Sequence, residues 1–315
     1  MKNMINKTHI EGYLYEHALE MKESGPNSKN PGTKFITGTV SIATDEAGVN
    51  IVPVHFTYVT ATTATGKANN TFTVLSNIVD GNIGTVMKDG KAKAGKLRID
   101  SALGLNEFYT DRNGKEELVS AKRNEGGFVH MVDVLVEDEK DRNTFECDMI
   151  ITGATRIEAN EERQTPEKVI VKGAIFDFRK NLMPIEFSAL NPNAMNYFED
   201  LGATSKEPVF TKIKGRQVSE TVVKTIVEKS AFGDDSVKEV KNSRRDFVIT
   251  WAAEDPYVWD DESTITVAEL NEAISKREVD LAAMKTRQDE YRASRGNAAA
   301  PANKIATPST GAFNF

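Results

Sequence analysis

The sequence of 315 residues contains a single cysteine, Cys147, which excludes an intramolecular disulfide and a zinc site built on cysteines. The four histidines are scattered and lack the spacing of metal ligands. No stretch approaches the roughly 18 consecutive apolar residues of a membrane span, and residues 1–7 lack the apolar segment of a secretory signal. We therefore expect a cytoplasmic protein without a metal or another cofactor.

Sequence motifs of the common enzyme classes are missing as well. The chain has no phosphate-binding loop, no dinucleotide fingerprint, no Gly-x-Ser-x-Gly and no His-Glu-x-x-His. The acidic runs 137–139 and 260–262 lie in charged, turn-like surroundings, which favours solvated faces over a magnesium site. Cys147 lies in a strand-like stretch without a paired histidine, which favours a buried and inert thiol. We expect that the protein is not an enzyme.

A surplus of positive charge is also absent, because 40 Lys and Arg stand against 47 Asp and Glu, a net charge of −7. Proteins that only coat duplex DNA are usually basic, since neutralised phosphates supply most of their affinity. Single-strand binders can instead combine a local basic groove with aromatic stacking on an acidic body. The hydrophobic fraction of 39% is enough for real cores, which excludes disorder of the whole chain.

Alternation of apolar and polar residues dominates the first 140 residues. Three strand-like stretches are followed by a short helix at 72–79 and by two further strand-like stretches. The five stretches span 9–15, 34–43, 49–60, 96–109 and 127–136. This is the element order of a five-stranded Greek-key barrel, the OB-fold.

The second half of the chain repeats this order. Its strand-like stretches span 149–157, 168–178, 183–190, 209–222 and 246–251. A helix begins after Asn191 and ends at Gly202. Gly38 and Gly173 each interrupt a strand, where a small barrel needs a bulge or a tight bend. We predict a fold dominated by β-structure with minor α-helix, built from tandem OB-like barrels. Unrelated β domains and one larger β-rich domain are the alternatives.

The C-terminal part predicts one long helix and a tail. Thr266 and Glu269 form a capping box at the start of an amphipathic helix, which we expect to dock on the preceding domain. Its apolar positions are Leu270, Ile274, Leu281, Met284 and Tyr291, interrupted by Arg277 and Gln288. Beyond residue 293 the Ala-, Pro- and Thr-rich composition is typical of a disordered tail. The predicted organisation is a first barrel at 1–140, a second barrel at 141–262, the helix at 263–293 and the tail at 294–315.

Aromatic residues and cations on the predicted strands remain as candidates for function. Single-strand binders stack bases on aromatic rings and follow the phosphates with Lys and Arg, whereas core packing is the competing interpretation for each ring. In the first half the candidates are Lys34, Phe35, Phe56, Tyr58, Lys96, Arg98, Lys122 and Arg123. In the second half they are Lys172, Phe178, Lys212, Lys214, Arg216 and Trp251.

Three of these cations, Lys212, Lys214 and Arg216, form a cation stripe, because they alternate with Ile213 and Gly215 along one predicted strand. Residues two apart share a strand face, so the three charges lie on the same side. Isolated charges are costly to bury, and this face must therefore meet water or a ligand.

Several strand-like stretches resemble the barrel strands of single-stranded DNA-binding proteins from phages and mobile elements. The stretches are 10–14, 35–44 and 96–103, and those at 245–251, 255–257 and 260–262 resemble the end of the second domain in that group. The resemblance covers residues 7–292 in the order of elements. It implies OB-folds, sequence-tolerant binding of single-stranded DNA, and a role in DNA replication or recombination.

The predicted C-terminal tail, residues 294–315, is the candidate region for binding other proteins. Bacterial relatives within this resemblance end in an acidic tip with a terminal Phe that recruits other proteins. Phe313 and Phe315 fit the aromatic end and are the candidates for binding replication or recombination proteins, but residues 294–315 contain no acidic residue. The alternative function is that of a virion or assembly structural protein, which predicts exposed apolar patches and no basic groove. The sequence does not determine the oligomeric state.

Overall fold

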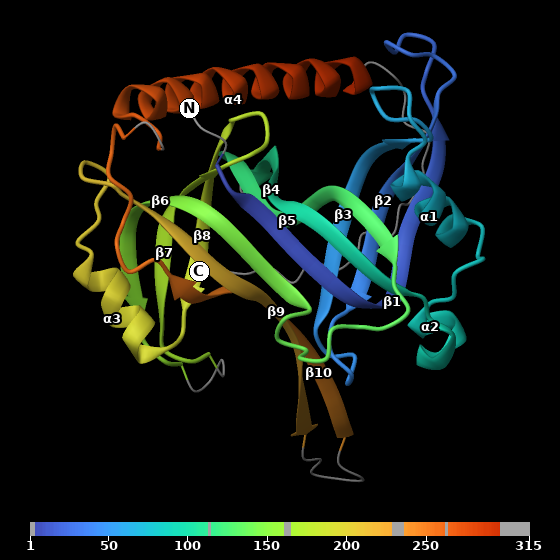
Figure 1. Ribbon diagram of the computed structural model, residues 1–315, viewed down its shortest axis with the longest axis horizontal. Coiled ribbons are helices and arrows are strands. Elements are labelled where there is room, and N and C mark those ends of the chain that lie inside the picture. Colours follow the sequence, from blue (N-terminus) through green and yellow to red (C-terminus); the bar gives the residue numbers. More distant parts are fainter. Residues whose placement is uncertain (1–3, 113–114, 161–164, 229–235, 262–263, 297–315) are drawn as a thin grey trace.

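The computed structural model describes residues 4–112, 115–160, 165–228, 236–261 and 264–296 (Figure 1). The first half contains β1 (Asn6–Glu23), β2 (Lys34–Ala43), β3 (Ile51–Thr60), α1 (Asn70–Val79), α2 (Val86–Asp89), the 3-10 turn η1 (Lys91–Lys93), β4 (Lys96–Arg112) and β5 (Lys115–Met131). The second half contains β6 (Asn143–Ile157), β7 (Lys168–Phe176), β8 (Leu182–Ala189), α3 (Pro192–Asp200), β9 (Val209–Glu228) and β10 (Ser236–Ala252). The described chain ends with α4 (Val267–Gly296).

The first five strands close into a barrel. β1 pairs with β2, β2 with β3, β3 in parallel with β5, β5 with β4, and β4 again with β1. Helix α1 lies between β3 and β4 in the chain and packs on the barrel core. The buried side chains of this core include Ile10, Leu14, Val40, Phe56 and Ile99. A closed ring with its helix between the third and fourth strands is the OB-fold.

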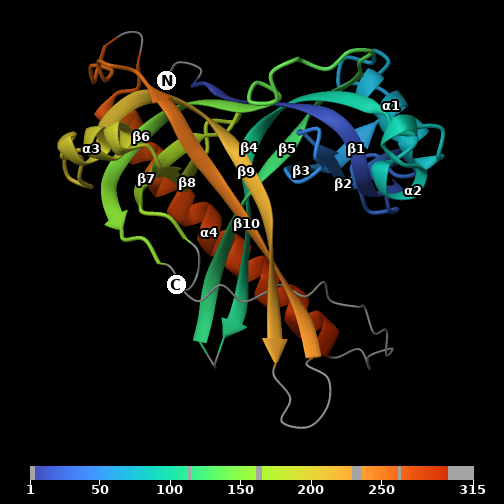
Figure 2. The same ribbon diagram turned by 90° about the horizontal axis from the view of Figure 1, so that it is seen from below.

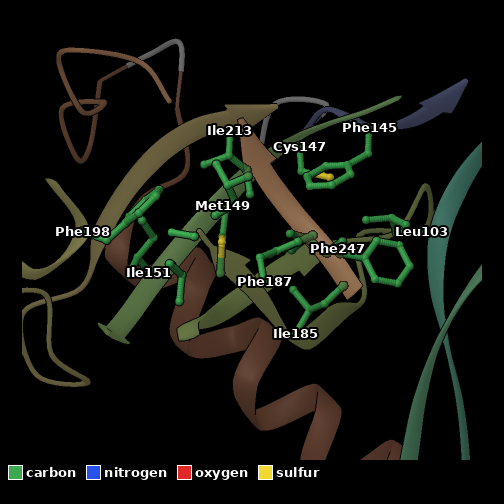
Figure 3. Close-up of a cluster of buried hydrophobic side chains, with 14 of the residues drawn as sticks. Leu103, Phe145, Cys147, Met149, Ile151, Ile185, Phe187, Phe198, Ile213 and Phe247 are labelled. Carbon is green, nitrogen blue, oxygen red and sulfur yellow. The ribbon is translucent and has the colours of Figure 1, made fainter. Parts of the chain in front are cut away.

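The second five strands repeat this ring. β6 pairs with β7, β7 with β8, β8 in parallel with β10, β10 with β9, and β9 again with β6. Helix α3 occupies the position of α1, and Asn191 caps it in front of Pro192, as predicted. Figure 3 shows the buried core of this barrel, in which Phe145, Phe187 and Phe247 pack together. The prediction of tandem OB barrels with a C-terminal helix is confirmed, whereas residues 297–315 of the predicted tail lie outside the described chain.

Several strands are longer than predicted, among them β1, which covers 6–23 where the pattern indicated 9–15. β5 covers 115–131, whereas the sequence pattern indicated residues 127–136, and β10 covers 236–252, whereas the pattern indicated 246–251. In both cases a hairpin ladder extends the strand, because backbone hydrogen bonds do not require the apolar alternation used for the prediction. The β4–β5 and β9–β10 hairpins project past the barrels in the same direction (Figure 2).

Gly38 and Gly173 lie where two strands approach closely. A Cβ at Gly38 would collide with the backbone of Ala18, and a Cβ at Gly173 would collide with the backbone of Ile150. Gly38 also has a φ of +127° and lies at a bulge between β2 and β3. Glycine is therefore required at both positions by the close approach of the strands, and at Gly38 also by the positive φ of the bulge.

Helix α4 lies along the β4–β5 hairpin (Figure 2). Its predicted capping box is present, since the amide of Glu269 donates to Thr266 Oγ1 (3.1 Å) and the amide of Thr266 donates to Glu269 Oε2 (3.0 Å). These bonds satisfy amides that a helix start leaves without partners.

The polar residues that interrupt the apolar pattern of α4 make its most specific contacts. Arg277 forms an ion pair with Glu107 of β4 (2.6 Å) and donates to the carbonyl of Leu182 in β8 (3.2 Å). The Gln288 amide accepts from Tyr109 N (2.9 Å) and donates to Tyr109 O (2.6 Å), so it covers an edge of β4 as a neighbouring strand would. The helix thus contacts both barrels, and not only the preceding one.

Paired strands and buried amides join the two barrels. β1 pairs with β6 over residues 6–10 and 143–147. Asn124 of β5 and Gln217 of β9 exchange two hydrogen bonds (2.9 and 2.7 Å), and both side chains are buried. Asn143 adds a bond to the Gln217 carbonyl (2.6 Å). Buried amides are stable only when they are satisfied, so this network favours one relative arrangement of the barrels.

We predict that Asn124→Leu lowers the free energy of unfolding by about 1–3 kcal/mol, because it leaves the Gln217 amide buried without its partner. Gln217→Met should have a similar cost. The double variant should cost less than the sum of the single variants, because neither half of the amide pair is then left alone. Urea denaturation of the four proteins measures this coupling, and additive costs would contradict it.

Candidate nucleic-acid interface

Lys34, Phe35 and Tyr58 come together at the ends of β2 and β3. The rings of Phe35 and Tyr58 lie 4.5 Å apart between centroids and are tilted by 34°. The Tyr58 hydroxyl lies 3.0 Å from Ser24 Oγ, in the loop between β1 and β2, and the Tyr58 side chain is half exposed. Lys34 is exposed at the start of β2. The structure therefore gathers three predicted site residues beside one loop.

A β-bulge places Tyr58 on this surface. Phe56 points into the barrel core, and strict alternation along β3 would send Tyr58 inward as well. The register against β2 shifts between Phe56 and Val59, so Val59 takes the inward position and Tyr58 turns outward. Nothing in the alternating sequence pattern marks this shift.

The prediction that Phe56 stacks on bases is wrong. Its side chain has no exposed surface, because it fills the centre of the first barrel. A base cannot reach a ring in this position. The same alternation that suggested a strand at 49–60 is the signal of a core ring here.

Lys122 and Arg123 lie on β5, where the barrels meet. Lys122 Nζ donates to the carbonyl of Glu186 in β8 (2.5 Å) and lies 5.1 Å from the centre of the Phe247 ring. Burial lowers the pKa of Lys122. Arg123 forms an ion pair with Glu125 on its own strand. Lys122 therefore contributes to the contact between the barrels.

Lys96 and Arg98 point outward from β4. Lys96 donates to the carbonyl of Asp133 (2.9 Å), and Arg98 Nε lies 3.4 Å from a carboxylate oxygen of Asp100. Phe128 of β5 is directly opposite Asp100 and is 70% exposed. The sequence does not distinguish this exposed ring from a core ring, because both occur on strands.

The cation stripe also points outward, from β9, and the two residues that alternate with it are buried. Lys214 Nζ lies 5.1 Å from the centre of the Trp251 ring, on the neighbouring strand β10. Lys212 and Lys214 lie 3.5 and 3.9 Å from the carboxylate of Glu146 in β6. Trp251 is half exposed, so a ring and two cations share one surface.

The remaining candidates lie elsewhere. Lys172 points outward from β7 and lies 3.9 Å from a carboxylate oxygen of Glu186. Phe178, in the turn after β7, is 87% exposed, and the Arg179 guanidinium lies 5.0 Å from the centre of its ring. Phe313 and Phe315 lie outside the described residues. The predicted residues thus occupy several separate surfaces.

Cys147 is buried next to Asn6 at the junction of the barrels. Burial raises the pKa of the Cys147 thiol, and the charge of Asp148 raises it further. The predicted inert thiol is confirmed as buried. In the described part of the chain, no group of three His, Cys, Asp or Glu side chains is placed to hold a metal ion, and no helix is long and apolar enough to cross a membrane.

The two closed rings define a protein of the tandem OB-barrel class. The chain belongs to the YorF family, whose model matches residues 5–287. Among solved structures, a deletion variant of the single-stranded DNA-binding protein from Thermus aquaticus is similar, with a TM-score of 0.45 and 10% identity, covering 83% of this chain and 100% of that chain. Similarity at this level identifies no ligand for this chain. No curated protein matches it in sequence.

We predict unequal stability costs for removing the two rings Phe56 and Tyr58 of β3. Phe56→Ala should lower the free energy of unfolding by about 3–5 kcal/mol, because it leaves a cavity in the core. Tyr58→Ala should cost about 1 kcal/mol, because it removes only half-exposed contacts with Phe35 and Ser24. Chemical denaturation measures both changes, and equal costs would contradict the inferred bulge.

Proposed function

We propose that the protein binds single-stranded DNA without strict sequence preference, through the outer face of β2 and β3 in the first barrel. The proposal depends on one observation, the ring pair of Phe35 and Tyr58 at the ends of these strands. Core packing does not account for this pair, because Tyr58 is half exposed.

The position of the ring pair favours a ligand over chance exposure. OB-folds bind oligonucleotides on the face of their second and third strands and with the loop between the first and second. Ser24 of that loop contacts the Tyr58 hydroxyl, which orients the ring. Stacking of a base on an aromatic ring contributes about 1–3 kcal/mol and accepts any base, since every base has a π-face.

Lys22 and Lys34 supply positive charge at the same place. Lys22 of β1 is directly opposite Phe35 in the ladder with β2, and both lysines are exposed. Lys22 Nζ lies 2.9 Å from the carboxylate of Glu20. An exposed ion pair of this kind contributes little, so Lys22 can exchange Glu20 for a phosphate at a small cost.

The biological setting belongs to the same proposal. A role in DNA replication or recombination is supported by the resemblance of the strand sequences. Recruitment of partner proteins through Phe313 and Phe315 is supported only by the aromatic end of the tail, because residues 294–315 lack the acidic residues of the related tips. The proposed activity is binding and requires no catalytic group.

We predict that the double change Phe35→Ala and Tyr58→Ala weakens binding of oligo-dT by about 1–3 kcal/mol, or roughly fivefold to 150-fold, because it removes the stacking platform. The logarithm of the wild-type affinity should fall linearly with the logarithm of salt concentration, by about 0.7 per phosphate contact. Fluorescence anisotropy at several salt concentrations measures both quantities.

Tyr291→Ala is the matched control, since it removes an exposed ring from α4 and should leave the affinity unchanged. Wild-type protein should bind oligo-dT more tightly than duplex DNA of the same length. Equal affinity for both DNAs, or unchanged binding by the double variant, would contradict the proposal. Complete absence of DNA binding would favour the structural alternative.

A further inference from the structure

The pairing of β1 with β6 makes one continuous outer surface from the two barrels. β5, β4 and β1 of the first barrel continue directly into β6, β9 and β10 of the second. β1, β6 and β9 run side by side across the middle of the molecule (Figure 1). We call the outward-pointing, uncovered side chains of these six strands the joint face. They are Phe128, His130, Lys96, Arg98, Asp100, Lys7, His9, Thr144, Glu146, Lys212, Lys214, Arg216 and Trp251.

A first row of the joint face crosses the junction in strict register. Trp251 of β10 is opposite Lys214 of β9, Lys214 is opposite Glu146 of β6, and Glu146 is opposite Lys7 of β1. Lys7 is exposed. Directly opposite residues on neighbouring strands have side chains close enough to interact. This row therefore connects a ring of the second barrel to a cation of the first.

A second row continues to the far end of the first barrel. Thr144 of β6 is opposite His9 of β1, His9 is opposite Asp100 of β4, and Asp100 is opposite Phe128 of β5. Because Lys7 and His9 are two residues apart on the same strand face, the two rows are adjacent. At about 4.8 Å per strand, the surface from Phe128 to Trp251 spans about 24 Å.

Other segments limit the joint face on two sides. Toward one end of β6 and β9, the Tyr257 hydroxyl covers Asp148 (3.0 Å), and the Tyr257 ring packs on Phe210. At the opposite border the loop 132–142 covers Glu11, whose carboxylate accepts from the Val136 amide (2.5 Å). The carboxylates of Asp148 and Glu11, at the two borders, are thus already hydrogen-bonded. On the joint face between these borders, Lys and Arg side chains outnumber the carboxylates.

We propose that the joint face holds the phosphate backbone of a single DNA strand that passes from one barrel to the other. This proposal rests on the proposed function and adds a second contact region to it. A polyanion fits the cations, and Phe128 and Trp251 provide a stacking ring at each end. Arg216 adds a third cation from β9 to this surface.

The test compares oligo-dT of about 8 and about 30 nucleotides, since one OB-fold covers about 4–16 nucleotides. The variant is Lys7→Glu with Lys214→Glu, one charge reversal in each barrel. The control is Lys93→Glu with Lys206→Glu, which makes the same charge change at exposed lysines outside the joint face. We expect the affinity of the charge-reversal variant for the long strand to fall about tenfold or more relative to the control. The slope of log affinity against log salt concentration should become shallower by about 1.4, or about 0.7 for each lost phosphate contact. The affinity for the short strand should change less than about threefold.

A second measurement follows the strand into the second barrel. The sequence has two tryptophans, Trp251 and Trp259, so a Trp259→Phe background leaves Trp251 as the only reporter. The long strand should quench its fluorescence, and the charge-reversal variant should lose this quenching. Lys7→Gln with Lys214→Gln gives a milder variant whose melting temperature can be matched to that of the wild type.

The outcomes separate the two proposals. If wild-type protein does not bind oligo-dT, the proposed function fails, and the joint face fails with it. In a second outcome, binding requires Phe35 and Tyr58, but the joint-face variants have the same affinities as their control for both the short and the long oligo-dT. The joint-face proposal is then wrong, and the proposed function stands. Loss of long-strand affinity and of Trp251 quenching in the joint-face variants, at unchanged short-strand affinity, supports the joint face.

Discussion

The shared use of β1 is the interaction on which the structure depends. This strand pairs with β2 and β4 to close the first barrel, and its residues 6–10 also pair with β6 of the second. Asn6 strengthens the junction, since its side-chain amide bonds to Leu103 N and O (both 2.9 Å) and to the carbonyl of Phe176 (3.1 Å). Leu103 of β4 in turn packs in the core of the second barrel. The core of the second barrel therefore includes a residue of the first.

The hydrogen-bonded polar groups at the junction determine the relative orientation of the two barrels more than they strengthen the contact between them. Apolar contacts are non-directional, whereas each buried amide requires its partner at a defined distance and angle. The side chains of Asn124 and Gln217 meet this requirement, and Asn143 Nδ2 and Asn50 Nδ2 both donate to the Gln217 carbonyl (2.6 and 3.2 Å). The orientation of the two outer faces is therefore determined by hydrogen bonds.

The two barrels carry related residues at equivalent places. In the first barrel, Glu11 of β1 is opposite Arg98 of β4, which is opposite His130 of β5. In the second barrel, Glu146, Lys214 and Trp251 occupy the same three strand positions. The repeat thus extends from strand order to a row of carboxylate, cation and ring. The loop 132–142 covers Glu11 in the first barrel. The row of Glu146, Lys214 and Trp251 in the second barrel is therefore more open to a ligand.

The sequence by itself determined the order of elements, the helix starts at Asn191 and Thr266, the glycine bends and the outward direction of the cation stripe. These features depend on local patterns, such as alternation, capping and backbone freedom, that a short stretch contains. Only the tertiary structure decided that Phe56 is core and Tyr58 is surface, because a bulge in the pairing with β2 reverses the alternation between them. It also decided that Lys7, on one barrel, adjoins Glu146 and Lys214 on the other, because strand pairing between distant segments depends on the register and is absent from either segment alone.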